Sequence, residues 1–267
     1  MASESQQKLS TLRTSRLVRD DSGDFRVYRD DAGSIFHSVT HILKETAPDN
    51  QKEALERWLA RPGSIQDRDL AANRGTRAHD ACEYTLKTAT QLARKTANKR
   101  NVWKTSPDGL ERCPTPITRW ALEKAALGAP KVPWNAAGYA RNLKGWILEN
   151  VTAIHACEFS IHHPAGFAGT CDALLDINGK GPYVVDWKTS QKERSEEMLT
   201  NYIHQIGAYS KGLTHLTGIK PIGGCIVVAR RTGAPQVRLL TELELKGAET
   251  MFLERIERYF ANLQQTA

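Results

Sequence analysis

Two carboxylates and an amine stand close together in a stretch with the pattern of a β-hairpin. Asp172 lies in an alternating run, and Asp186 and Lys188 lie in a β-rich run beyond a turn-rich segment. If the loop comprises residues 178–180, pairing is centred on Gly179 and Asp172 lies opposite Asp186. Residues two apart on a strand share a face, so Lys188 joins them. The hairpin is therefore predicted to gather three ionisable groups on one face.

These three groups suit the hydrolysis of a phosphodiester bond. Carboxylates this close repel each other, and a divalent cation relieves the repulsion. Mg²⁺ prefers hard oxygen ligands, which Asp172 and Asp186 supply, and the backbone carbonyl of Trp187 offers a third. The ammonium of Lys188 can hold the attacking water or stabilise the charge of the transition state. A hairpin with ordinary cross-strand ion pairs is the alternative, although apolar neighbours on the same face argue against solvated charges.

Two further residues are candidates for the same site. Glu158 falls on an alternating segment that predicts the preceding strand, and its carboxylate could orient a metal-bound water. His79 shares a predicted helix face with Glu83, four residues further on. A lone histidine on a helix is more often a satisfied or exposed side chain than a metal ligand, so spacing alone leaves both interpretations of His79 open.

The apolar periodicities predict an α/β protein. Helices are predicted over residues 49–60, 65–87, 115–127, 134–150, 195–213 and 244–264, and strands over 25–29, 34–37, 151–161, 171–177, 183–188, 224–230 and 236–240. This order implies a mixed central sheet with flanking helices. Gly75 is a candidate break in the second helix. Residues 90–115 are polar and interrupted by proline and glycine, which predicts a flexible arm, and 90–150 as a whole has the character of a helical insertion or arch.

Composition narrows the class of protein. The 267 residues are enough for a sizeable core, and no apolar run approaches the roughly 20 residues that a membrane span needs. Residues 1–19 are rich in Ser and Thr with four bases and one acid, which fits a disordered tail or a transit peptide. Five scattered cysteines without CxxC spacing disfavour a disulfide framework, a structural zinc and an iron–sulfur cluster. A reducing intracellular compartment fits best: the cytoplasm of a bacterial or phage-infected cell, with the mitochondrion as the alternative.

The basic charge is concentrated in one part of the chain. Net charge is +7, and residues 91–148 hold eleven bases against three acids, a surplus of eight that leaves the remainder about neutral. The same segment holds four of the six tryptophans. Basic groups interleaved with aromatic rings suit single-stranded nucleic acid, whose phosphates and bases they contact. A solvated helical face with tryptophans in the core is the alternative.

Several sequence blocks together resemble a known family. Gly169 to Asp172 (GTCD), Val185 to Ser190 (VDWKTS) and the spacing Gln205-x3-Tyr209 resemble the PD-(D/E)XK nuclease superfamily in its RecB-like exonuclease branch. Arg74-Gly75-Thr76-x2-His79 is similar to the upstream histidine motif of that branch. The blocks look like those of mitochondrial genome maintenance exonucleases and their phage relatives. Cys171 departs from the proline of the superfamily's name.

The resemblance implies a fold, a cofactor and a substrate. It implies a restriction-endonuclease-like core: residues 1–20 as a tail and 21–267 as one nuclease domain, with 90–150 as a basic helical insertion that forms an arch for a threaded strand and 151–243 as the catalytic sheet. It implies Mg²⁺ or Mn²⁺ as the cofactor and, since the cysteine cluster of some members is absent, no iron–sulfur cluster. The expected partner is DNA, single-stranded, without a membrane, and the protein is taken to be a monomer.

The resemblance also assigns roles to residues. It implies metal ligation by His79, Asp172 and Asp186, and catalysis by Lys188 with the two aspartates. The carbonyl of Trp187 and the carboxylate of Glu158 remain candidates from their places on the predicted strands. The residues expected to contact DNA are Arg74, Lys95, Lys99, Arg100, Trp103, Lys104, Gln205 and Tyr209. For Arg74 a structural ion pair is the alternative, and for Gln205 and Tyr209 a place in the helix core or on its surface.

The sequence thus predicts a metal-dependent DNA exonuclease that prefers single strands with a free end. Two alternatives stand beside it: a non-catalytic nucleic-acid-binding protein on the same fold, and a structure- or sequence-specific endonuclease. Intact Asp172, Asp186 and Lys188 argue against the first. Cleavage of internal sites in duplex DNA would favour the second.

Overall fold

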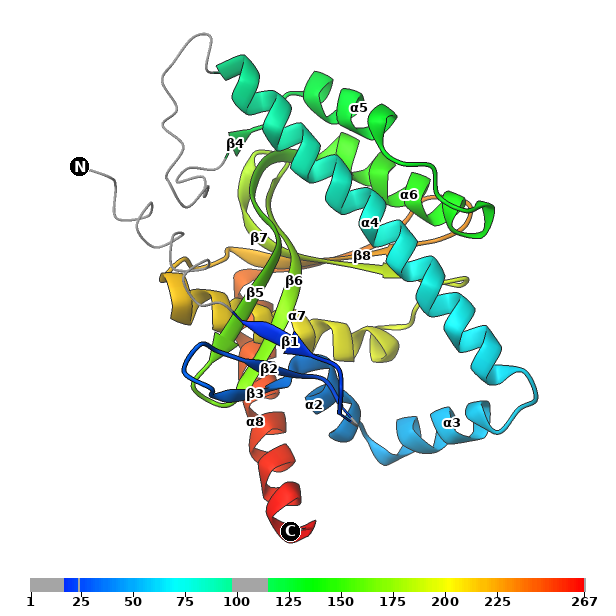
Figure 1. The fold of residues 1–267 in the computed structure, drawn as a ribbon, viewed down its shortest axis with the longest axis vertical. Helices are drawn as coiled ribbons and strands as arrows, with labels where there is room; N and C mark the ends of the chain where they lie inside the picture. The colour runs from blue at the N-terminus through cyan, green and yellow to red at the C-terminus, as the bar shows by residue number, and fades with distance from the viewer. Residues whose placement is uncertain (1–16, 24, 98–114, 267) are drawn as a thin grey trace.

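The computed structural model describes residues 17–23, 25–97 and 115–266. Within them a nine-stranded mixed sheet is covered by helices on both faces (Figure 1). The strands run in the order β1-β2-β3-β6-β7-β8-β9, and β5 pairs with β6 and with the short β4. The predicted mixed α/β class is confirmed. No helix in the described part of the chain is long and apolar enough to cross a membrane.

The strands and helices have the following bounds. The strands are β1 (Val18–Asp20), β2 (Val27–Arg29), β3 (Ile35–Ser38), β4 (Thr115–Pro116), β5 (Val151–His163), β6 (Phe167–Ile177), β7 (Lys180–Thr189), β8 (Gly223–Ala229) and β9 (Gln236–Leu240). The helices are α2 (Val39–Glu45), α3 (Asp49–Leu59), α4 (Ser64–Ala97), α5 (Arg119–Gly128), α6 (Trp134–Asn150), α7 (Glu196–Thr217) and α8 (Glu242–Thr266).

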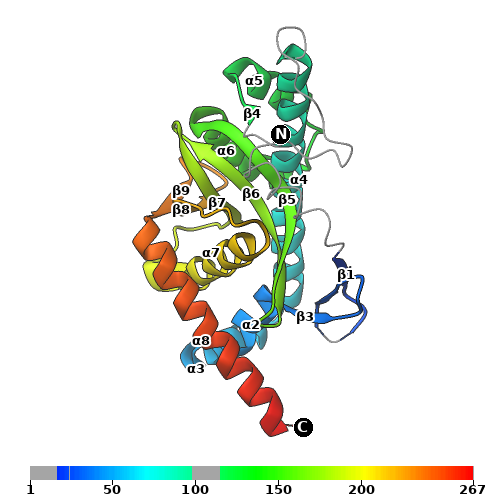
Figure 2. The ribbon, with the colours of Figure 1, turned by 90° about the vertical axis from the view of Figure 1, so that its left-hand side faces the viewer.

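Two apolar layers hold this arrangement together. On one face, residues of α4, α5 and α6 pack against Ala173, Val185 and Trp187 of the sheet. On the other face, α2, α7 and α8 pack against Leu174 and Val184. Figure 2 shows α7 and α8 on one side of the sheet and α4 on the other. Alternate residues of β7, and of β6 from Ala173 onward, therefore serve different layers, as the pleat of a strand requires. At Asp172 the alternation of β6 is interrupted, because Cys171 belongs to the layer of Leu174 and not to that of Ala173.

The hairpin of β6 and β7 has the predicted register beside Asp172, but its turn differs from the predicted three-residue loop. Ala173 pairs with Val185 and Leu174 with Val184, so the register carries Asp172 towards Asp186. The tip is a two-residue turn in which Asn178 and Gly179 have φ of 51° and 76°, the left-handed values of a type I′ turn. A bulge between Leu175 and Ile177 offsets the shorter loop. The prediction of a three-residue loop was wrong at the tip.

Helix α4 differs most from prediction. It runs without interruption for 34 residues, through Gly75 and past residue 90, where the insertion was predicted to begin. Small buried residues on one side of this helix, among them Ala78, Cys82 and Ala89, let it lie close to the sheet. Tertiary packing thus prolongs a helix whose own sequence gives no strong signal after residue 87.

Helices α5 and α6 are part of the core and do not form an arch that stands clear of it. Tyr139, Leu143, Trp146 and Ile147 of α6 are buried in the layer that covers the sheet. Trp146 meets Trp187 of β7 edge to face, with ring centroids 5.6 Å apart. The interpretation of this part of residues 90–150 as an arch is therefore corrected. Residues 98–114 of the predicted arm lie outside the described residues.

Truncation of α6 tests this correction. Leu143 is fully buried, so Leu143→Ala should lower the free energy of unfolding by about 2–5 kcal/mol, because apolar burial is reduced and a cavity is left behind. Urea denaturation followed by circular dichroism measures the change. Leu127 of α5 is 87% exposed, and Leu127→Ala should change stability by less than about 0.5 kcal/mol. A change for Leu143→Ala as small as that of the control would contradict the core assignment.

Candidate active site

The predicted catalytic residues lie where the sheet divides. Strand β5 pairs along one edge of β6, while the other edge meets β3 at Phe167 and Ala168 and β7 from Ala173 onward. The intervening part of β6, which ends at Asp172, has no strand partner on that edge within the described chain. Because β7 diverges from β6 here, the side chains at the end of the hairpin gain space that a continuous sheet would deny them.

Asp172 spans the gap between the two strands. Its Oδ2 accepts a hydrogen bond of 2.6 Å from the backbone N–H of Trp187, so a side chain replaces a bond of the ladder. Its Oδ1 lies 3.6 Å from Nδ1 of His79, which α4 brings to the site. The side chain of Trp187 points into the opposite layer, as its burial against α6 requires. The role of the Trp187 carbonyl as a metal ligand stays a prediction.

A chain of hydrogen bonds from α7 supports Asp186. Gln205 donates from Nε2 to Asp186 Oδ1 at 3.1 Å and contacts the hydroxyl of Tyr209 at 2.7 Å. Both helix residues are buried. The Tyr209 ring fits because Gly169 of β6 lacks a side chain: a Cβ there would lie 2.8 Å from the ring. The glycine of the GTCD block thus makes room for the tyrosine of the Gln-x3-Tyr block.

Lys188 completes the group on this face. Its ammonium forms an ion pair with Asp186 Oδ2 and lies 5.0 Å from the ring centroid of Tyr202, a cation–π contact. Tyr202 was not among the predicted site residues. The signal that could have found it is its spacing, three residues before Gln205 and seven before Tyr209, which places all three on one face of α7.

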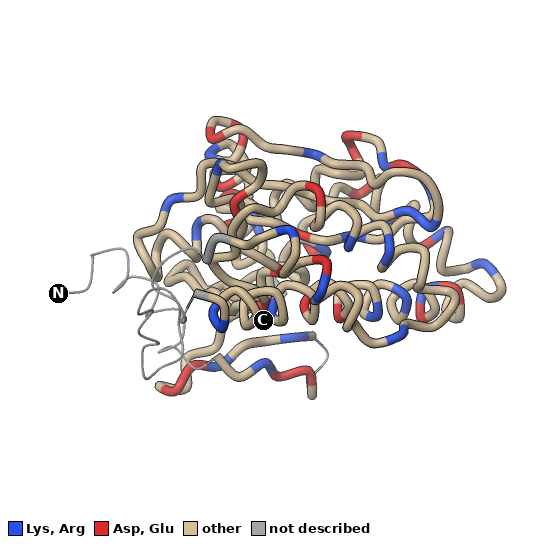
Figure 3. The backbone as a smooth tube through the Cα atoms, turned by 90° about the horizontal axis from the view of Figure 1, so that it is seen from above, with Lys and Arg blue, Asp and Glu red and all other residues tan. Residues whose placement is uncertain are grey.

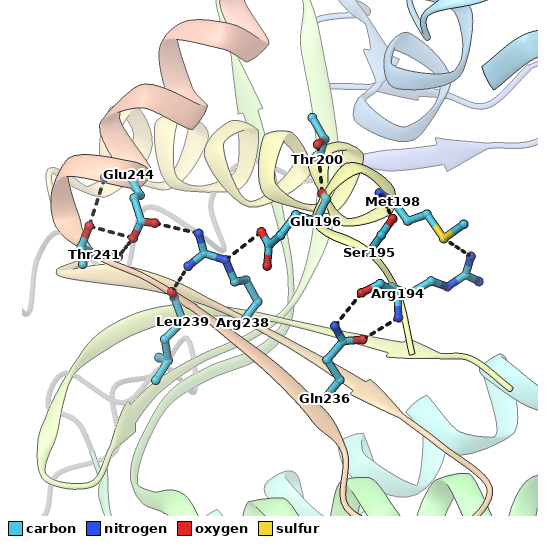
Figure 4. Close-up of polar contacts among 10 residues, drawn as sticks. All are labelled: Arg194, Ser195, Glu196, Met198, Thr200, Gln236, Arg238, Leu239, Thr241 and Glu244. Carbon is cyan, nitrogen blue, oxygen red and sulfur yellow. Dashed lines mark hydrogen bonds and ion pairs between the residues drawn. The ribbon is translucent and has the colours of Figure 1, made fainter. Parts of the chain in front are cut away.

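The start of α7 is held by polar contacts that keep these residues in place (Figure 4). Gln236 of β9 exchanges two hydrogen bonds, of 2.8 and 2.7 Å, with the backbone of Arg194. Arg238 of β9 joins Glu196 of α7 to Glu244 of α8. Ser195 caps the helix by accepting from the N–H of Met198. The segment that follows Lys188 is thereby fixed to the sheet.

Burial and mutual repulsion set the charges of the site. Burial raises the pKa of Asp186 to about 6, and the nearby Asp172 adds to the shift against the opposing effect of Lys188. Burial acts on Asp172 in the same direction, but His79, Lys188 and the N–H of Trp187 outweigh it and hold its pKa below the ordinary value. Burial would lower the pKa of Lys188 and of His79, yet the two aspartates raise both. The pair of carboxylates therefore favours the protonated forms of Lys188 and His79.

Glu158 lies beside this group in an uncommon backbone conformation. On either side of it Cys157 pairs with Ala173 and Phe159 with Cys171, so Glu158 stands opposite Asp172. Its φ is +50°, in the left-handed region that non-glycine residues seldom adopt and that recurs at functional sites. Burial raises its pKa to about 7, and the charges of Asp172 and Glu83 add to this effect.

The donor set fits a hard divalent cation in its chemistry. Asp172 and Asp186 present carboxylate oxygens, His79 adds an imidazole, and Asp186 Oδ2 is a buried oxygen whose contact is the ammonium of Lys188. In the geometry that the described residues adopt, no three His, Cys, Asp or Glu side chains already form a metal cluster. Lys188 is paired with that same oxygen, and its ammonium would have to share or yield this position to an ion.

The predicted DNA contacts are only partly gathered here. Gln205 and Tyr209 lie in the site, as described above. Arg74 lies on α4 with its guanidinium 4.8 Å from the ring centroid of Tyr139, and its buried Nε has no hydrogen-bond partner among the described residues. Its contact with DNA stays a prediction. Lys95 is exposed near the end of α4, about 24 Å along the helix from His79. Lys99, Arg100, Trp103 and Lys104 lie outside the described residues.

Residues 91–148, the basic segment rich in tryptophan, have two interpretations: a nucleic-acid-binding surface, or a solvated face with tryptophans in the core. The described part fits each interpretation in part. Trp146 is buried in the core, whereas Trp120 and Trp134 are exposed and lie beside Lys124 and Arg231 respectively. Lys and Arg are interspersed with Asp and Glu along the described backbone (Figure 3). The described part of the segment thus contributes one core tryptophan, Trp146, and two tryptophans in surface cation–aromatic pairs.

A family model described as the PD-(D/E)XK nuclease superfamily matches residues 9–266, a range that includes the hairpin and His79. The chain belongs to that superfamily, as its sequence blocks predicted. It is also similar to human mitochondrial genome maintenance exonuclease 1, with 26% identity over 239 residues. The match covers 85% of this chain and 58% of the human protein, so the chain spans well under two thirds of that relative's length.

The raised pKa of Glu158 predicts a pH-dependent stability. Between pH 4.5 and about 7 the folded protein retains a proton that the unfolded chain has released, so the contribution of Glu158 to stability falls as pH rises through this window. Glu158→Gln should therefore gain stability relative to wild type between pH 4.5 and 8, by at most about 2 kcal/mol because solvent screens part of the effect.

Urea denaturation in EDTA at the two pH values measures this difference. Glu257→Gln, at an exposed position on α8, controls for the removal of a carboxylate. A Glu158→Gln effect that is the same at both pH values would contradict the assigned burial of this charge.

Proposed function

We propose that the protein is a metal-dependent DNA exonuclease that acts on single strands with a free end. The observation that carries the proposal is the convergence of Lys188 and His79, both partly buried, on the buried carboxylates of Asp172 and Asp186 at the point where the sheet divides. Membership of a nuclease superfamily supports the reaction class. The name of the human relative, an exonuclease, supports the finer assignment.

Each residue has a distinct part in the proposed reaction. Lys188 holds the attacking water against the phosphate, or stabilises the negative charge that develops on the phosphate oxygens, because its ammonium stays protonated beside two carboxylates. Gln205 fixes the orientation of Asp186 through Oδ1, while Oδ2 faces the ammonium of Lys188. Glu158, opposite Asp172, is placed to orient a water at the edge of the site.

Asp172, Asp186 and His79 are the residues that would hold Mg²⁺ or Mn²⁺, with the Trp187 carbonyl as a further candidate. A bound divalent ion supplies Lewis acidity to the phosphate and lowers the pKa of a bound water. Asp172 and Asp186 would also be relieved of mutual repulsion by the ion. The N–H of Trp187 and the amide of Gln205 keep one oxygen of each carboxylate in place for this task.

Replacement of the lysine gives the first test. Lys188→Ala should lower the rate of cleavage of end-labelled linear single-stranded DNA in Mg²⁺ by roughly 10²–10³-fold, because it removes the cation that faces the phosphate. The control is Lys180→Ala, since Lys180 is exposed at the other end of the same strand. Quenched time courses on denaturing gels give the rates.

The same gels decide the finer points. EDTA should abolish cleavage, and circular single strands should resist it because they offer no end. Cleavage that survives both Lys188→Ala and EDTA would contradict the proposed chemistry. Equal cleavage of circles and linear strands would replace the exonuclease by the endonuclease alternative.

Lys95, near the end of α4, gives a separate prediction about DNA binding. Lys95→Ala should reduce the slope of log affinity against log salt concentration by roughly 0.7 for a long single strand, which is the value for a single phosphate neutralised by one lysine. A short oligonucleotide that fills only the catalytic site should show no change, because Lys95 lies about 24 Å away along α4. Lys220→Ala, exposed beyond the end of α7, is the matched control. An unchanged slope for the long strand would remove Lys95 from the DNA path.

A further inference from the structure

A cavity of about 560 Å³ lies between α2, α3 and α7. Its volume falls within the roughly 300–1,000 Å³ of small-molecule sites. Leu43 of α2 and Leu55 and Leu59 of α3 line it from one side, and Asn201 and Tyr202 of α7 from the other. None of the roles proposed above for the hairpin uses this space.

The cavity adjoins the catalytic group directly. Tyr202 and Gln205 of α7 line it, and these same residues contact the catalytic side chains. The Tyr202 ring lies 5.0 Å from the ammonium of Lys188, and Gln205 donates to Asp186. A group in the cavity is therefore next to any phosphate that lies against Lys188.

The lining suits a flat, uncharged ring with polar edges. Leucines and a tyrosine offer apolar surface for the faces of such a ring. Gln51 Nε2 and Gln205 Oε1, which take no part in the hydrogen bonds that hold Asn201 and Asp186, offer a donor and an acceptor for its edges. This combination is found where proteins bind unstacked nucleobases.

The charges around the cavity balance. Lys44 and Lys52 are matched by Glu45 and Glu56, and Lys44 lies 3.5 Å from Glu45. A neutral cavity beside a cationic lysine separates the two parts of a nucleotide: the phosphate is drawn to Lys188, and the uncharged base to the cavity.

The outer wall presents apolar surface that nothing in the described chain covers. Helix α3 has no buried residue, and Leu55 is 45% exposed. A hydrogen bond of 3.2 Å from Asn201 to Gln51 links the wall to α7. The floor, in contrast, is held by the buried Arg255, which donates to Asn201 Oδ1 and to the carbonyl of Leu43. A ligand would add the apolar contacts that α3 lacks.

We propose that this cavity receives one unpaired nucleobase of the DNA strand, adjacent to the phosphodiester bond that is cleaved. The proposal rests on the proposed nuclease function. It makes α3 and α7 a determinant of substrate class, because the amides that line the cavity occupy the edge of the base that a partner strand would otherwise pair with.

Single-turnover cleavage of strands that carry one abasic site, moved along the sequence, tests the proposal. For wild type, an abasic site at one position next to the cleaved bond should slow cleavage at least about tenfold. The double variant Leu55→Ala/Leu59→Ala should cleave intact and abasic strands at similar rates. Leu243→Ala, at a leucine of α8 that is 80% exposed and does not line the cavity, should behave as wild type. Equal wild-type rates at every abasic position would overturn the proposal.

A binding measurement separates this proposal from the nuclease function. The Lys188→Ala protein in EDTA should quench the fluorescence of 2-aminopurine at one position of a single strand, and the two leucine substitutions should abolish the quenching. This holds even if wild type proves to cleave nothing. No quenching at any position overturns the proposal. Quenching that survives the leucine substitutions also overturns the proposal. So would leucine substitutions that change only the oligomeric state, measured by sedimentation, and leave the quenching as it is.

Discussion

Two like charges buried at the end of one hairpin are the constraint on which the rest of the structure depends. Asp172 and Asp186 would repel each other strongly in a dry sheet. Four groups stabilise the two carboxylates: a backbone N–H and an ammonium from β7, a side-chain amide from α7 and an imidazole from α4. The elements that flank the hairpin are thus held to positions from which these groups can reach.

Helix α4 shows how packing serves chemistry. Its buried face is made of small residues such as Ala78 and Cys82, which allow the helix axis to approach the sheet. His79, next to this face, is thereby carried to within 3.6 Å of Asp172. Larger core residues at the same positions would push the helix outward and take the imidazole out of contact.

The sequence predicted which residues gather at the candidate site better than it predicted the elements around them. The register of the hairpin follows from local alternation and a turn signal. The motif blocks pointed to His79, Gln205 and Tyr209, which the fold places in the same group of contacts as the two aspartates. The length of α4 and the burial of α6 depend on partners distant in sequence, which no local pattern reveals. Tyr202 and the neighbouring cavity were missed for the same reason: a surface between three helices exists only once they are packed.

The turn and the bulge of the hairpin give insertions and deletions unequal effects. Residues added at Asn178–Gly179 would lengthen the loop. The pairs on the far side of the bulge from the tip, from Leu175–Tyr183 to Ala173–Val185, would stay unchanged. Loss of one residue between Asp172 and the bulge would slip the strands by one position and turn alternate side chains over. An acid would then point into the layer that now holds Trp187. Variation in length among related chains should therefore be concentrated at the tip and be rare within the strand.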